Sequence, residues 1–426
     1  MQSSQSFRGM RDILPGEVER RSHFLDTIRT VYASHGFHEI ETPIVDSLEI
    51  LENSGGGENE KLIFKLLKRG EKLQLTDDIS PDDLVDGGLR FDLTVPLCRF
   101  YAENAVRLPK PFRSLQIGQV FRAERPQKGR YRQFLQADID IIGDSTALSE
   151  IELLIASGHA LHRLGLESFE VRLNDRRALE QILLKQGVGI DQIIGVMVAL
   201  DKLDKSSPEQ VVKEIIARGV DPGVAESILE ALGRANGQHV VDELANAGAE
   251  EAILSNLEEI VSKVRGSIHG MGVRIDPLCV RGLGYYTSTV FEYSSPKWGS
   301  SIAGGGRYDS MMSRFGLDQP ACGVSLGFER IHAVLAGTEG TAGTSSRRNL
   351  YLLFDQTEQL GEALAAAREY RKSGFSVILV SHRHGGRSPM KRLASEAEEL
   401  RRQGAQGEYW FLQLGNDAEP RLLMHG

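Results

Sequence analysis

The stretch that decides the fold is FRAERPQKGRYRQFLQADIDIIG, which runs from Phe121 to Gly143. Apolar residues precede its first arginine, and apolar residues alternate with polar ones after its last arginine. Alternation with a period of two is typical of half-buried β-strands. The stretch therefore predicts two antiparallel strands joined by a basic loop. The cations of this loop are Arg122, Arg125, Lys128, Arg130 and Arg132.

The basic loop indicates a site for polyphosphate. The planar guanidinium group of arginine binds phosphate oxygens through paired hydrogen bonds, and Arg122 directly follows the apolar Phe121. The structural alternative is an exposed hairpin whose charges are solvated. In the returning strand Gln136, Asp138 and Asp140 are spaced two apart, so they share one face. That face is suited to a cationic or hydrogen-bonding group.

A second segment, LRFDLTVPLCRF at residues 89–100, has a similar texture. We interpret it as a strand in which Asp92 and Thr94 lie on one face, together with Arg90. The spacing is equally compatible with a functional face and with a structural ion pair such as Arg90–Asp140, because both kinds of arrangement place charges among apolar residues.

Three further segments combine a strand-like pattern with glycine or arginine. In VRGLGYYTSTVF (280–291) a lone charge, Arg281, precedes an apolar strand, so it either pairs with a carboxylate or binds an anionic ligand. SIAGGGRYDSMMSRF (301–315) places glycines between a strand and an expected helix, without the signature of a P-loop. In GVSLGFERIHAVL (323–335) Arg330 lies near the helix start, where the dipole disfavours a cation. This indicates either an anionic ligand such as an ATP phosphate or a salt bridge.

Composition narrows the class of protein. The chain has 426 residues, more than one hydrophobic core usually covers, so we expect two or three domains. With 41% hydrophobic and 26% charged residues it reads as a soluble globular protein. We expect no membrane span and no signal peptide. The cysteines are Cys98, Cys279 and Cys322, and their wide spacing favours a reducing compartment, most simply the cytoplasm.

Missing motifs and the negative net charge argue against several other classes of function. The sequence has no nucleophile elbow, HExxH or CxxC motif, which argues against a covalent nucleophile and against a protein-bound zinc. The net charge of −9 argues against non-specific nucleic-acid binding by the whole chain, although a local basic site for one nucleic acid remains compatible with it.

The pattern changes along the chain. Residues 173–265 form a series of amphipathic helical segments broken by Gly and Pro. Residues 337–348, GTEGTAGTSSRR, have linker composition. After residue 349 strand and helix patterns alternate, which predicts a small α/β domain with a partly parallel sheet.

Taken together, these segments resemble the histidyl-tRNA synthetases, a family of class II aminoacyl-tRNA synthetases. GFHEIETPIVDSLEIL, with Pro43, looks like class II motif 1; FRAERPQKGRYRQFLQADIDIIG looks like motif 2 and GVSLGFERI like motif 3. RGLGYYTSTVFEY is similar to the family's RGLDYYT block, AGGGRYD to its second block, and LRFDLTVPLCRF to its LRYDLTVPxAR form. The similarity runs from FRGMRDILP to about residue 335.

The resemblance implies roles for the matching positions. Arg122 would bind the α-phosphate of ATP, Glu124 the adenine, and Arg330 the γ-phosphate. Arg281 would contact the α-phosphate and the substrate carboxylate, where other class II enzymes use a metal ion. These three arginines would be the catalytic residues, and Arg130 would lie near both ATP and the amino acid. The histidine-binding residues would be Asp92, Thr94, Arg130, Gln136, Asp140, Arg281, Tyr285, Tyr286 and Tyr308.

The fold implied is α+β: an antiparallel sheet flanked by helices, with a helical insertion and a small C-terminal α/β domain. We expect a class II catalytic domain, a helical insertion domain, a linker, and an anticodon-binding-like α/β domain that is shorter than is usual in the family. Their expected bounds are residues 1–172 with 262–335, residues 173–261, residues 336–348 and residues 349–426.

The activity implied is the ATP-dependent formation of histidyl-adenylate, with Mg²⁺, followed by transfer of the histidyl group to tRNA(His) by a homodimer. Two positions depart from the family pattern: Gly284 stands where Asp is usual, and Ser288 where Gly or Arg is usual. A second hypothesis is a paralogue that does not charge tRNA. It would be either a regulatory subunit of ATP phosphoribosyltransferase or another amino-acid-activating enzyme.

Overall fold

A computed structural model describes most of the chain. The chain divides into two compact units, unit 1 (Met1–Met10 and Ile28–Gly337) and unit 2 (Arg11–Thr27 and Thr338–Gly426). Within the described residues, no helix combines the length and the apolar character that crossing a membrane requires. The described residues are 5–52, 61–73, 80–126, 129–203, 206–234, 239–280, 285–335, 348–355, 359–382, 390–402 and 407–424.

Unit 1 is built on an eight-stranded sheet with the order β1-β5-β6-β11-β10-β9-β7-β8. All neighbouring strands are antiparallel except the outer pairs β1/β5 and β7/β8. The sheet confirms the predicted α+β class and the predicted hairpin around the basic loop. In chain order the strands are β1 (His38–Glu39), β5 (Phe112–Phe121), β6 (Gln133–Ile142), β7 (Phe169–Asp175), β8 (Met271–Ile275), β9 (Thr289–Ser295), β10 (Trp298–Arg307) and β11 (Ala321–Gly327).

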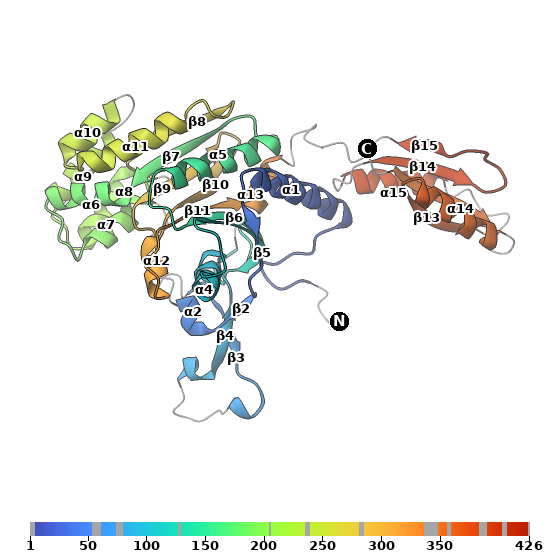
Figure 1. Ribbon diagram of the computed structural model, residues 1–426, viewed down its shortest axis with the longest axis horizontal. Helices are drawn as coiled ribbons and strands as arrows, with labels where there is room; N and C mark the ends of the chain where they lie inside the picture. Colours follow the sequence, from blue (N-terminus) through green and yellow to red (C-terminus); the bar gives the residue numbers. More distant parts are fainter. Residues whose placement is uncertain are drawn as a thin grey trace. The chain divides into compact units, whose positions relative to one another are not determined.

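Helices cover this sheet, as Figure 1 shows for the part coloured from blue-green to orange. Helix α5 contacts β6 and β11, and helix α13 contacts β6 and β10. Helix α4 packs against α2 and α12 around a core that includes the buried residues Leu97, Tyr101 and Met312. The bounds are α2 (Leu48–Glu52), α4 (Thr94–Asn104), α5 (Leu148–Arg163), α12 (Asp309–Arg314) and α13 (Phe328–Leu335). Helix α1 (Pro15–Ser34) belongs to unit 2 up to Thr27 and to unit 1 from Ile28.

The prediction of a strand through residues 89–100 is wrong. Strand β4 (Val85–Leu89) ends there, pairs with β2 (Val45–Asp46) and β3 (Phe64–Leu67), and is followed by α4. Asp92 Oδ1 accepts a hydrogen bond from the Val95 backbone N–H at 3.2 Å, which serves the start of the helix. A proline in the first turn fits a helix and could not pair within a sheet.

The glycine run is also placed differently from the prediction. Gly304–Gly306 lie inside β10 and not between a strand and a helix. A Cβ atom at Gly305 would stand 2.0 Å from the carbonyl oxygen of Gly323, and one at Gly306 would stand 2.5 Å from that of Thr289. The glycines are therefore required because neighbouring strands approach closely on both sides.

The helical pattern predicted for residues 173–265 is confirmed from residue 176 onward, since residues 173–175 complete strand β7. The helical segment joins β7 to β8, and the domain bounds predicted around it stay a prediction. Its helices are α6 (Arg176–Lys185), α7 (Ile193–Leu200), α8 (Pro208–Ala217), α9 (Pro222–Arg234), α10 (Val240–Ala247) and α11 (Glu251–Val264).

Unit 2 contains a four-stranded sheet with the order β13-β12-β14-β15. Strand β12 pairs in parallel with β13 and β14, and β15 is antiparallel, so the predicted partly parallel sheet is confirmed. One core joins one face of β12 to α15, and the other core joins the opposite face to α14. The bounds are β12 (Arg348–Asp355), α14 (Leu360–Lys372), β13 (Phe375–His382), α15 (Met390–Arg402), β14 (Glu408–Gln413) and β15 (Arg421–Met424).

Candidate active site

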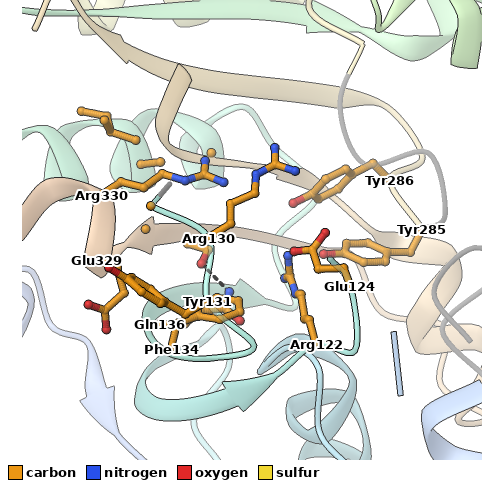
Figure 2. Close-up of a pocket in the computed structure, with 16 residues that line it drawn as sticks. Arg122, Glu124, Arg130, Tyr131, Phe134, Gln136, Tyr285, Tyr286, Glu329 and Arg330 are labelled. Carbon is orange, nitrogen blue, oxygen red and sulfur yellow. Dashed lines mark hydrogen bonds between the residues drawn. The ribbon is translucent and has the colours of Figure 1, made fainter. Parts of the chain in front are cut away.

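A pocket of about 170 Å³ opens in unit 1 where the β5–β6 loop, strands β6, β10 and β11, and the start of α13 meet. Arginines, tyrosines and glutamates are among the side chains that line it, and Figure 2 labels them. The lining residues are Arg122, Glu124, Gly129, Arg130, Tyr131, Phe134, Gln136, Tyr285, Tyr286, Ile302, Ala303, Gly304, Ser325, Gly327, Glu329 and Arg330.

Most of the residues predicted for the site line this pocket. Those brought together are Arg122, Glu124, Arg130, Gln136, Tyr285, Tyr286 and Arg330. Four others do not line it and belong to buried structure or to the start of α4: Asp92, Thr94, Asp140 and Tyr308. Arg281 and Gly284 lie outside the described residues.

The basic loop forms one wall, and its first arginine is anchored from behind. Arg122 Nε donates to the carbonyl oxygen of Phe91 at 3.0 Å, and its guanidinium carbon lies 5.1 Å from the centroid of the Phe134 ring. Such a stacked arginine keeps its remaining N–H groups for an anion. Within the described residues Arg122 and Arg130 have no ion-pair partner, so the structure favours a ligand site over a self-neutralised hairpin.

The third arginine comes from the opposite side of the pocket. Arg330 lies in the first turn of α13, as predicted, and its Nη1 donates to the carbonyl oxygen of Ser301 at 2.6 Å. In the view of Figure 2 the guanidinium groups of Arg330 and Arg130 point into the same space. Arg330, which bonds to Ser301 of strand β10, and Arg130, which lies on the basic loop, are thus placed on different sides of the pocket. Two cations in this arrangement are suited to bind one polyphosphate between them.

The polar face of β6 forms a buried floor beneath the arginines. Gln136, Asp138 and Asp140 are 6%, 4% and 3% exposed and lie on one face, as predicted. Gln136 Nε2 donates to Ser325 Oγ at 2.6 Å and to Asp138 Oδ2 at 3.4 Å. Tyr308 Oη donates to Asp140 Oδ1 at 2.7 Å. The floor is therefore a hydrogen-bonded layer that reaches from the pocket into the core.

Burial changes the charge state of this floor. It raises the pKa of Asp92 to about 6, against the lowering effect of the Val95 N–H and of Arg122. It raises the pKa of Asp140 to about 7, with the Tyr308 hydroxyl opposing and Asp92 adding to the shift. The pKa of Asp138 is also well above its usual range, because of burial and the neighbouring Asp140. Carboxyl groups poised in this way can accept or donate hydrogen bonds near neutral pH.

The ion pair considered between Arg90 and Asp140 is wrong. Arg90 instead donates to carbonyl oxygens, from Nε to Gln119 and from Nη1 to Thr42, each at 2.8 Å. The guanidinium thus ties the segment before β2 to strand β5. Asp140 Oδ1 accepts its hydrogen bond from Tyr308.

Sequence reasoning missed two residues that shape the pocket. Ser325 receives the Gln136 amide because β11 runs beside β6, where Ser325 is in register with Asp138. Phe134 supports Arg122 from the adjacent strand. Alternation could place Phe134 in a strand, but the pairing of residues about 190 positions apart has no local signal in the sequence.

Comparison with known proteins is consistent with this geometry. A family model described as histidyl-tRNA synthetase matches residues 9–331. A histidine–tRNA ligase of Leifsonia xyli subsp. xyli is 41% identical over 393 residues, covering 87% of this chain and 88% of that protein. The chain belongs to the histidyl-tRNA synthetase family. The resemblance predicted from the motifs is thereby confirmed.

Solved structures of the same fold extend over nearly the whole chain. The histidyl-tRNA synthetase of Nostoc sp. PCC 7120 superposes with a TM-score of 0.73 at 26% identity, covering 97% of this chain and 92% of that one. A Bacillus halodurans structure described as an ATP phosphoribosyltransferase regulatory subunit/histidyl-tRNA synthetase gives 0.75 at 20% identity, covering 96% and 98%. At that identity the likeness concerns the fold alone. The class II synthetase fold predicted for this histidyl-tRNA synthetase family member is confirmed.

Proposed function

We propose that this chain is a histidine–tRNA ligase, which activates L-histidine with ATP and transfers the histidyl group to tRNA(His). The observation that carries the proposal is a cationic pocket wall above a buried polar layer, which Gln136 joins to the pocket, in a member of the histidyl-tRNA synthetase family. An anionic nucleotide and an amino acid with two basic nitrogens match these two surfaces.

In this proposal the cationic wall binds ATP. Arg122 holds the α-phosphate, Arg330 the γ-phosphate, and Glu124 the adenine, while Arg130 lies between ATP and the amino acid. Arg281 contacts the α-phosphate and the histidine carboxylate. The support for these roles is that the four described residues line one pocket, and that guanidinium groups are the usual protein partners of phosphate.

The chemistry needs positioning and charge stabilisation and no protein nucleophile. The histidine carboxylate oxygen attacks the α-phosphorus, the bond from that phosphorus to the bridging oxygen breaks, and pyrophosphate leaves with the electron pair. Arginines reduce the repulsion between the two anions and stabilise the charge that develops on the phosphate oxygens. The terminal hydroxyl of tRNA then attacks the carbonyl carbon of the adenylate, and AMP leaves.

The buried floor is proposed to recognise histidine. The set is Asp92, Thr94, Gln136, Asp140, Tyr285, Tyr286 and Tyr308. Asp140, which Tyr308 fixes by a hydrogen bond, would take an N–H of the imidazole, and Gln136 would take the ammonium group. An analogue that cannot form these hydrogen bonds would leave buried polar groups of the site unpaired, and it would therefore bind more weakly than histidine.

Several wider features belong to the same proposal. Mg²⁺ would arrive with ATP and be held mainly by phosphate oxygens, since the described residues include no group of three or more side chains suited to hold a metal. A homodimer would form through the segment resembling motif 1, where Ile44 and Val45 are 44% and 49% exposed beside the edge strand β1. We also propose the domain bounds given above and a cytoplasmic location.

The test is ATP–pyrophosphate exchange followed by aminoacylation. Purified protein should exchange label between pyrophosphate and ATP only with histidine present, and Arg281→Ala should abolish the exchange. Total tRNA and labelled histidine should then give histidyl-tRNA. No exchange with histidine would refute the proposal, and exchange without charging would identify a paralogue that activates the amino acid only.

A further inference from the structure

The N-terminal segment Ser6–Met10 forms a closed turn. The Met10 N–H donates to the carbonyl oxygen of Phe7 at 2.9 Å, and Ser6 Oγ donates to the carbonyl oxygen of Met10 at 3.0 Å. Gly9 is the third residue of the four-residue turn Phe7–Met10 and has a φ of 85°, a conformation that glycine adopts without strain. The turn is therefore fixed by its own hydrogen bonds.

This turn lies against the basic loop. The carbonyl oxygen of Gly9 accepts a hydrogen bond from the Arg132 backbone N–H at 2.7 Å. A Cβ atom on Gly9 would stand 2.8 Å from Pro126 Cγ and 2.9 Å from Arg132 Cγ, so the loop packs directly on the glycine. On the other side of the turn, the Phe7 ring meets the Phe64 ring of β3 edge to face, with centroids 6.4 Å apart. The turn thus bridges β3 and the base of the loop.

Arg132 carries this contact to the pocket wall. Its Nε donates to the carbonyl oxygen of Glu124 at 3.0 Å and its Nη2 to that of Ala123 at 3.4 Å. Its own carbonyl oxygen accepts from the Arg122 N–H at 2.8 Å. Arg122 and Glu124 line the pocket, whereas Arg132 does not. Arg132 can therefore influence a ligand only through the residues that it holds.

We propose that residues Phe7–Met10 form a strap that fixes the basic loop in its ATP-binding conformation, with Arg132 as the positioning residue. The proposal rests on the proposed function, in which the loop binds ATP. A loop held in its bound conformation loses less freedom when the nucleotide binds. The histidine side does not depend on the strap, because Asp140 and Tyr308 are held by strands and by each other.

The first test compares two glycine substitutions. Gly9→Ala introduces a side chain at positive φ and against the loop. Gly266→Ala introduces the same strain at a φ of 78°, but no atom lies within 4 Å of its added Cβ. Gly9→Ala should raise the KM for ATP in pyrophosphate exchange about tenfold, because even a small displacement of the groups that bind ATP weakens their contacts with it. The KM for histidine should change less than about twofold, and Gly266→Ala should change neither constant.

A second variant keeps the proposal testable if Gly9→Ala does not fold. Arg132→Lys retains the charge but loses the planar fork that reaches two carbonyl oxygens. It should show the same selective rise in the KM for ATP, and hydrogen exchange of the amides in residues 122–132 should be faster than in the wild type. Amide hydrogen exchange in β6 should stay unchanged, whereas a general loss of stability would make it faster there too.

The strap and the proposed function fail in different ways. Absence of histidine-dependent exchange in the wild type refutes the function, and calorimetric titration with Mg²⁺–ATP still measures the effect of the strap on nucleotide affinity. The strap proposal is overturned if Gly9→Ala or Arg132→Lys binds ATP like the wild type. It is also overturned if the KM values for ATP and histidine rise equally.

Discussion

The wall of the pocket and the buried layer beneath it carry charge in opposite ways. The wall made by Arg122, Arg130 and Arg330 is partly exposed, so its cations stay hydrated until a ligand replaces the water. The floor that contains Asp138 and Asp140 is almost fully buried. Burial raises the pKa of both carboxyl groups, to about 7 for Asp140, so the charge of Asp140 varies with pH near neutrality. The permanent positive charge of arginine suits the binding of phosphate, and a carboxyl group whose charge changes with pH suits the recognition of histidine.

The largest effect is expected at the wall. Arg122→Ala should lower the rate of histidine-dependent pyrophosphate exchange about 10³-fold, because it removes a donor to charge that develops in the transition state. Arg125→Ala is the matched control, since Arg125 is an exposed cation of the same loop that does not line the pocket. Equal losses in the two variants would show that the net charge of the loop matters and its geometry does not.

A smaller effect is expected at the floor, and it should depend on pH. Because the pKa of Asp140 is about 7 and that of Asp92 about 6, both carboxyls ionise as the pH rises from 5.5 to 8. The KM for histidine should fall over this range, since an ionised Asp140 accepts the hydrogen bond from the imidazole N–H more strongly than a protonated one. Asp140→Asn should raise the KM at pH 8 about 10²-fold and weaken its pH dependence. An unchanged pH profile in the variant would contradict the role of this carboxyl.

The same carboxyl should affect stability in the opposite direction. Its folded pKa lies above the unfolded value near 3.8, so between these values the folded protein binds more protons, and the free energy of unfolding falls as the pH rises from about 4 to about 7. Asp140→Asn should be more stable than the wild type at pH 8 by about 2 kcal/mol, and similar to it at pH 4. Urea denaturation without ligands measures this, and a variant that is less stable at pH 8 would contradict it.

The smallest effect is expected away from the pocket, at a histidine pair. His35 Nε2 and His159 Nδ1 lie 2.9 Å apart, and the pKa of His35 is lowered by burial and by His159. When the pKa of a histidine is lower in the folded than in the unfolded protein, the free energy of unfolding decreases as the pH falls below about 6.5. Replacing His35 with glutamine should remove about 0.5 kcal/mol of this acid loss, since the pair is partly solvated. Urea titrations at pH 7 and 5.5 would separate it from the carboxyl effect, which has the opposite sign.

Local patterns predicted much of the pocket wall. The alternation around the basic loop predicted the β5–β6 hairpin, and the switch from strand to helix near Arg330 predicted the end of β11 and the start of α13. These elements are set by side-chain periodicity, which is a property of neighbouring residues. Periodicity failed at Asp92 and Thr94, because a short run that starts a helix has the same alternation as a strand.

The sequence by itself determined the residue types of the site, the hairpin that carries Arg122, and the family, because motifs and periodicity are local and ordered along the chain. Only the tertiary structure decided that Ser325 holds Gln136, that Tyr308 fixes Asp140, and that Arg90 bonds to carbonyl groups. These contacts join residues that are distant in sequence, and the order and register of the strands bring them together. The raised pKa values of the floor arise in the same way, since burial exists only once the sheet and its helices have packed.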